Sequence, residues 1–202
     1  MGSLHKSDPQ EVKFIVPRPT IKDLFGKTIR QRRPRFEAAL ERADRRTLAD
    51  RAARVRWLYR VIPKNVGFGL PLETAFVFEE AQYSFTYGNF VAVIVLAASF
   101  VEHWFASNLA SRGYGKEASK GLAASIKCAR INNLVDPLIL DKADQLRLIR
   151  NPFTHLKASE HPHTVGRRAV EKRTDPMDLV ENDAKEAITA MFGVALYAFR
   201  RS

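Results

Sequence analysis

Residues 81–101 read AQYSFTYGNFVAVIVLAASFV and contain no charged side chain. A run of this length could cross a bilayer, which needs about 20 predominantly apolar residues. Its first half, however, is diluted by polar side chains, at Gln82, Ser84, Thr86 and Asn89. Only residues 90–101 are densely apolar, and about twelve such residues are more typical of a buried bundle helix than of a membrane span. The stretch therefore predicts a core helix, and no stable membrane insertion is expected.

The segments around this stretch also have helical periodicity. Apolar residues recur three or four positions apart, and no segment alternates with a period of two as a half-buried strand would. The expected helices cover residues 36–62, 72–87, 90–111, 116–132, 141–149 and 179–200. A polar, basic loop is expected at residues 156–178. We therefore predict an all-α fold, an antiparallel bundle of four or five helices with a basic amphipathic helix at its N-terminal side.

Positive charge is concentrated near the N-terminus. The chain has 202 residues, with 33 Lys and Arg against 22 Asp and Glu and a net charge of +11. Residues 1–60 hold 16 of the basic and 7 of the acidic side chains, which makes their net charge +9. We interpret residues 1–63 as a basic arm with an amphipathic helix, and residues 64–202 as the helical bundle. Such a basic helix suits contact with RNA or phosphate, while a solvated face that docks on the core is an equal alternative.

Composition also narrows the cellular context. The single cysteine, Cys128, excludes an internal disulfide and a cysteine-rich zinc site. The opening residues lack the apolar run of a secretory signal. A cytoplasmic protein without a metal or another cofactor is therefore expected.

The stretch most informative about function is LRLIRNPFTH, residues 146–155. Pro152 has no amide donor and disfavours a helical conformation at Asn151. We expect the helix to break here, with Asn151 as the N-cap of a new turn. Arg150 and His155 would then face each other across the new helix start. An unbroken helix would instead separate them by about 140° of rotation, given roughly 100° per residue.

An arginine beside a histidine at a helix N-terminus suits a phosphodiester. The guanidinium and the free amides can bind a phosphoryl oxygen, and the imidazole can move protons near neutral pH. With the ribose 2′-hydroxyl as the nucleophile, such a site would cleave RNA without a metal and would refuse DNA. A capped, kinked helix with an ion-binding surface is the structural alternative for the same residues.

The motif Arg150-Asn151-Pro152-Phe153-Thr154-His155 in its helical context resembles the HEPN family (higher eukaryotes and prokaryotes nucleotide-binding). The resemblance covers residues 72–200, about two thirds of the chain. It implies a metal-independent endoribonuclease of a toxin–antitoxin or antiviral defence system, acting as a homodimer and regulated by an antitoxin protein. It also implies that Arg150 holds the phosphoryl group, that His155 acts as general acid and base, and that Asn151 positions them. Other family members are catalytically silent RNA- or protein-binding modules, and this alternative stays open.

Two further sets of residues complete the candidate site. Glu102, at the end of the apolar helix, needs a cationic partner, because an unpaired buried carboxylate is costly. An ion pair with Arg150 would make Glu102 part of the site, and Arg147 is the alternative partner. A cationic loop that grips a phosphate backbone is expected from Lys157, His161, His163, Arg167 and Arg168. An ordinary solvated loop is equally compatible with these residues.

Overall fold

The computed structural model describes residues 36–62 and 71–199. The chain divides into two compact units, residues 1–46 and 47–202. The described residues of the first unit form the beginning of α1 (Phe36–Val61), where an ion pair joins Arg45 to Glu41 at 3.1 Å. Most of the predicted basic arm lies outside the described residues.

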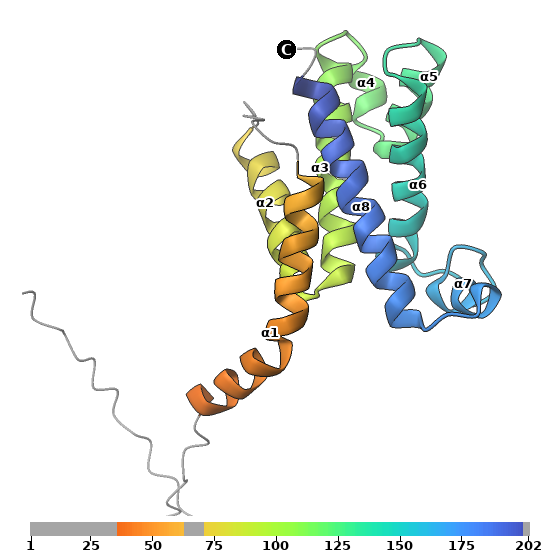
Figure 1. Cartoon of the computed structure of the whole chain (residues 1–202). Coiled ribbons are helices and arrows are strands. Elements are labelled where there is room, and N and C mark those ends of the chain that lie inside the picture. The colour runs from red at the N-terminus through yellow and green to blue at the C-terminus, as the bar shows by residue number, and fades with distance from the viewer. Residues whose placement is uncertain (1–35, 63–70, 200–202) are drawn as a thin grey trace, which may run out of the picture. The chain divides into compact units, whose positions relative to one another are not determined.

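The second unit contains the remainder of α1 and all other described helices (Figure 1). These helices are α2 (Leu72–Tyr87), α3 (Phe90–Ala110), α4 (Gly115–Ala118), α5 (Leu122–Ile131), α6 (Pro137–Thr154), α7 (Val165–Lys172) and α8 (Pro176–Phe199). No strand occurs in the two described ranges. The all-α prediction and the helical bundle are therefore confirmed.

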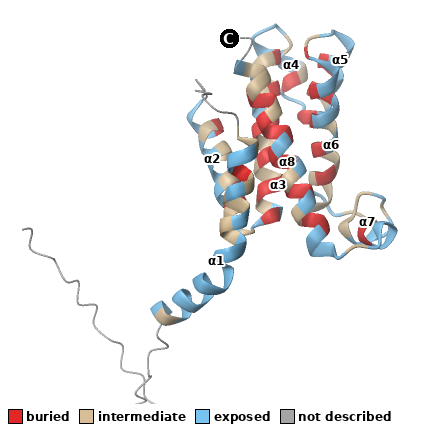
Figure 2. Cartoon of the chain, viewed as in Figure 1, coloured by how far each residue is buried: buried red, intermediate tan, exposed pale blue. Residues whose placement is uncertain are grey.

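The core is built around α3, which packs against α2, α4, α5, α6 and α8. Buried residues gather on α3 and on the sides of its neighbours that face it (Figure 2). Phe78 of α2 links the layers, because its ring centroid lies 5.2 Å from that of Phe100 on α3 and 5.5 Å from that of Phe192 on α8. The densely apolar residues 90–101 thus belong to the central helix of the bundle.

By length and composition, α3 is also the one described helix that could cross a membrane. The central helix of a soluble bundle meets the same criterion, because it can be equally long and equally rich in apolar residues. Phe100 and Phe105 of α3 are fully enclosed by protein atoms. The geometry of α3 is thus that of a core helix.

Several predicted boundaries are wrong. The single helix expected at residues 116–132 is two helices, α4 and α5, because Gly121 between them has a φ of +90°, a conformation that ends a helix. α6 begins at Pro137 rather than near Asp141, since the side chain of Asp136 accepts a hydrogen bond from Leu138 N at 2.8 Å and caps the helix. The expected loop at residues 156–178 contains α7.

The turn between α2 and α3 holds the second half of α1 in place. Gly88 ends α2 with a φ of +79°, and its N–H donates to Phe85 O. Arg54 of α1 lies against this turn. The contact is so close that a Cβ added at Gly88 would come within 2.9 Å of Arg54 Nη1. Trp57 packs one turn further along, with its ring centroid 4.9 Å from that of buried Phe85.

Candidate functional site

The predicted break in the motif does not occur. α6 continues through Pro152 to Thr154, and the N–H of His155 donates to Asn151 O at 2.9 Å. A proline costs little here, because it removes one backbone hydrogen bond in the last turn of a helix that ends two residues later, at Thr154. Asn151 is therefore not an N-cap, and His155 is the C-cap, with an extended backbone (φ −137°, ψ 128°).

This correction changes the electrostatics of the site. The expected free amides of a helix N-terminus are replaced by the carbonyl end of α6. The partial negative charge at a helix C-terminus favours cations there, such as a guanidinium or a protonated imidazole. Any phosphoryl group at this end must therefore be held by side chains.

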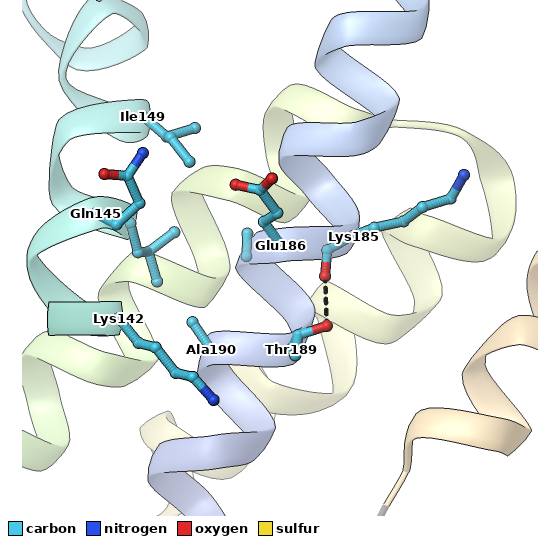
Figure 3. Close-up of a pocket in the computed structure, with 9 residues that line it drawn as sticks. Lys142, Gln145, Ile149, Lys185, Glu186, Thr189 and Ala190 are labelled. Atoms are coloured by element: carbon cyan, nitrogen blue, oxygen red, sulfur yellow. Dashed lines mark hydrogen bonds between the residues drawn. The ribbon is translucent and has the colours of Figure 1, made fainter. Parts of the chain in front are cut away.

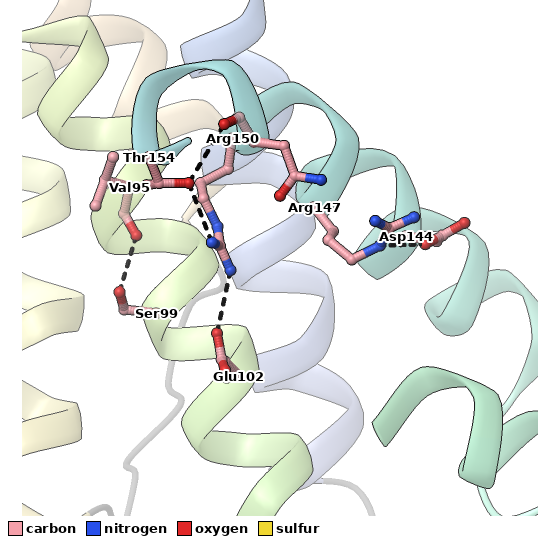
Figure 4. Close-up of polar contacts among 8 residues, drawn as sticks. Val95, Ser99, Glu102, Asp144, Arg147, Arg150 and Thr154 are labelled. Carbon is pink, nitrogen blue, oxygen red and sulfur yellow. Dashed lines mark hydrogen bonds and ion pairs between the residues drawn. The ribbon is translucent and has the colours of Figure 1, made fainter. Parts of the chain in front are cut away.

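Arg150 is fixed by two side chains (Figure 4). Its Nη2 donates to Glu102 Oε2 at 3.2 Å, and its Nη1 donates to Thr154 Oγ1 at 3.2 Å. The side chain of Arg150 is 17% exposed and that of Glu102 is 34% exposed, so the pair lies at the edge of the core. The predicted pairing of Glu102 with Arg150 is thus observed. The alternative partner, Arg147, instead contacts Asp144 at 2.7 Å.

His155 lies next to this cluster in sequence but is not bonded to it. His155 is exposed, and among the described residues no hydrogen bond joins its ring to Arg150. Thr154, four residues after Arg150, occupies the neighbouring position on the same helix face, as the helical repeat requires. The expected direct juxtaposition of Arg150 and His155 is therefore replaced by the contact between Arg150 and Thr154.

The cationic loop is divided by the structure into buried and exposed parts. Arg168 of α7 forms two hydrogen bonds of 2.6 Å with the carboxylate of Asp183 on α8, and their side chains are only 14% and 2% exposed. The hydrogen bond to Asp183 is the main reason why the pKa of Arg168 is raised. Nη1 and Nη2 of Arg168 both donate to Asp183. Arg168 therefore connects α7 to α8 and does not contribute to an exposed cationic surface.

The remaining loop residues stay closer to the surface. Arg167 pairs with Glu171 at 2.6 Å across one helical turn. The rings of His161 and His163 lie 5.4 Å apart, and His161 Nδ1 accepts a hydrogen bond from the His163 backbone N–H at 3.3 Å. Lys157 is half-buried. In the described parts of the chain, no three His, Cys, Asp or Glu side chains are arranged to hold a metal ion.

Sequence reasoning did not identify the cavities beside α8. One, of about 300 Å³, lies between α6 and α8, with Leu146, Ile149 and Ala190 among its lining residues. Gln145 and Glu186 border the same space, whereas Lys185 extends away from α6 (Figure 3). Another, of about 400 Å³, lies between α1 and α8. No spacing of residues in the sequence marks either cavity, because each depends on how two helices separated along the chain pack together.

Comparisons with known proteins add no relative. No protein-family model, no curated protein and no solved structure matches this chain. The resemblance to the HEPN family thus depends on the residues of the motif and on the helical context of the chain.

Proposed function

We propose that this protein is a metal-independent endoribonuclease of a toxin–antitoxin or antiviral defence type. The observation that carries the proposal is the ion pair between Arg150 and Glu102 near the end of α6, with the exposed His155 as the C-cap of the same helix. An arginine has five N–H donors, of which two contact Glu102 and Thr154 here. The remaining donors suit a phosphoryl oxygen, and Glu102 and Thr154 act as positioning residues for the guanidinium.

The proposed reaction uses the substrate's own nucleophile. The imidazole of His155 takes the proton from a ribose 2′-hydroxyl, whose oxygen attacks the adjacent phosphorus. A bond between the 2′-oxygen and phosphorus forms while the bond to the 5′-oxygen breaks, and the departing oxygen receives a proton from the imidazolium. The products are a 2′,3′-cyclic phosphate and a free 5′-hydroxyl. The guanidinium of Arg150 stabilises the charge that develops on the phosphoryl oxygens.

The rest of the proposal concerns partners and surroundings. A second copy of the chain, an antitoxin protein and a cytoplasmic location follow from the resemblance of the motif to the HEPN family. Lys157, His161, His163 and Arg167 are the loop residues proposed to contact RNA. Arg168 is not one of these proposed RNA contacts, because its guanidinium is bound to Asp183.

A catalytically silent RNA- or protein-binding module is the second candidate. Two observations favour it: the charge of Arg150 is compensated by Glu102, and no hydrogen bond joins Arg150 to His155 within the described residues. A site of this kind would bind anions weakly and would transfer no proton.

Cleavage of labelled RNA in EDTA distinguishes the two candidates. We expect His155→Ala to lower the cleavage rate by about 10²–10⁴-fold, the range typical of a lost general acid or base. His103→Ala is the matched control, because His103 is also exposed but lies on α3, where it contacts Thr74 at 3.4 Å. Equal rates for the two variants would refute the role of His155. RNA binding without cleavage by the unmodified protein would favour the silent module.

A variant of Glu102 tests how Arg150 is positioned. Glu102→Gln keeps the shape of the side chain but removes its charge, so Arg150 loses its ion-pair partner. We expect a lower maximal cleavage rate with little change in the apparent affinity for RNA, because the guanidinium is present but less well placed. An unchanged rate would exclude a positioning role for Glu102.

A further inference from the structure

The cavity between α1 and α8 has the composition of a small binding site. It has a volume of about 400 Å³ and is lined by Asp50, Ala53, Arg54, Trp57, Arg60, Glu181 and Lys185. Cavities of about 300–1,000 Å³ accept ligands of the size of a nucleotide. All of these residues belong to the same compact unit, residues 47–202.

Arg54 lines this cavity, and its guanidinium contacts uncharged groups at the turn between α2 and α3. Its guanidinium carbon lies 5.0 Å from the centroid of the Phe90 ring, and its nitrogens lie against the backbone of Gly88. Among the described residues, no carboxylate forms an ion pair with Arg54. A cation that is stacked on an aromatic ring keeps its charge and most of its hydrogen-bond donors for a ligand, and it loses little side-chain entropy when the ligand binds.

The other lining residues define what kind of anion fits. Trp57 is half-buried and fixed against Phe85, so it offers a rigid aromatic surface. Lys185 is already paired with Glu181 at 2.9 Å, which leaves Arg54 and Arg60 as the cations available to a ligand and Asp50 as the acidic group. One compensating carboxylate favours a ligand with a single phosphate over a polyphosphate. Asp50 can also accept hydrogen bonds from a ribose hydroxyl or from an amino group of a base.

We infer that this cavity binds one nucleoside monophosphate unit, with the base on Trp57 and the phosphate on Arg54. Stacking on an aromatic side chain tolerates any base, because every base has a π face. The site is separate from Arg150 and His155 and requires no cleavage. The unit is a free nucleotide or part of a single strand, since both have the same chemistry.

The test measures the fluorescence of Trp57 in a Trp104→Phe background, in which Trp57 is the only tryptophan. We expect AMP to quench this fluorescence saturably. Arg54→Gln should weaken AMP binding about tenfold, which is the effect of losing one charge-assisted contact. The control is Arg56→Gln, because Arg56 is exposed on α1 and does not line the cavity. Isothermal titration of AMP into the protein with both tryptophans gives the same comparison without the Trp104 substitution.

Three further ligands identify the chemistry. Adenosine should bind at least about tenfold more weakly than AMP and should be insensitive to Arg54→Gln, because it has no phosphate. Inorganic phosphate should cause little quenching. Tighter binding of a short single-stranded oligonucleotide than of AMP would assign the site to a strand, and the reverse would assign it to a free nucleotide. Absence of saturable AMP binding, or equal effects of Arg54→Gln and Arg56→Gln, would overturn the inference whether or not the protein cleaves RNA.

Discussion

Loss of the ion pair between Arg168 and Asp183 should lower the free energy of unfolding more than loss of most other polar contacts in the bundle. Asp183 is 2% exposed and forms both of its 2.6 Å hydrogen bonds with the guanidinium of Arg168. Asp183→Asn removes the negative charge and leaves a largely buried cation without its partner. Breaking a buried ion pair on one side typically costs about 3–5 kcal/mol. We expect a loss of this size in the free energy of unfolding.

The exposed pair between Arg167 and Glu171 is the matched control for this prediction. Their side chains are 51% and 48% exposed. Glu171→Gln should therefore cost only about 0–1 kcal/mol. The assay is urea unfolding followed by circular dichroism at 222 nm, with the slopes of the transitions compared. A cost below about 1 kcal/mol for Asp183→Asn would refute the reasoning, because it would place the Arg168 pair in the class of exposed pairs.

Two other predictions concern the core and the loop before α7. Phe85 is fully buried and contacts the ring of Trp57. Phe85→Ala should therefore lower the free energy of unfolding by about 3–5 kcal/mol in the same urea assay. A cost below about 1 kcal/mol would contradict this packing. The Ser159 hydroxyl donates to Glu160 at 2.6 Å and is the main cause of the lowered pKa of Glu160. A depressed carboxyl pKa stabilises the fold above the unfolded-state pKa, and this stabilisation is lost as the pH falls through the folded-state pKa. Ser159→Ala should therefore raise the pKa of Glu160 in a carbon-13 NMR titration, and an unchanged pKa would exclude the hydrogen bond.

Local patterns were enough to predict the helical fold. The apolar residues at 90–101 and the three-and-four spacing elsewhere identified the core helix and the all-α class, because burial of one apolar face dictates that repeat. The boundaries were less predictable. Gly121 divides one expected helix because of its backbone conformation, and the cap at Asp136 competed with equally plausible acidic residues at 141 and 144.

The candidate site was predicted in part. Glu102 was expected to need a cation because an unpaired buried carboxylate is costly, but Arg150 and Arg147 were both possible partners, and the structure identifies Arg150. Pro152 was expected to break the helix, but its place in the last turn allows α6 to continue to Thr154. Arg168 was indistinguishable in sequence from its exposed neighbour Arg167. Only the packing of α7 on α8 reveals that Asp183 neutralises Arg168.

The most direct test of the proposed reaction replaces the nucleophile in the substrate. A labelled RNA is first cleaved in EDTA to locate its main cleavage position, and then the same RNA is made with one 2′-deoxynucleotide on the 5′ side of that bond. Cleavage at that bond should stop while other bonds remain sensitive, and the products elsewhere should end in 2′,3′-cyclic phosphates. Continued cleavage at the deoxy position would contradict attack by the 2′-hydroxyl and, with it, the roles proposed for Arg150 and His155.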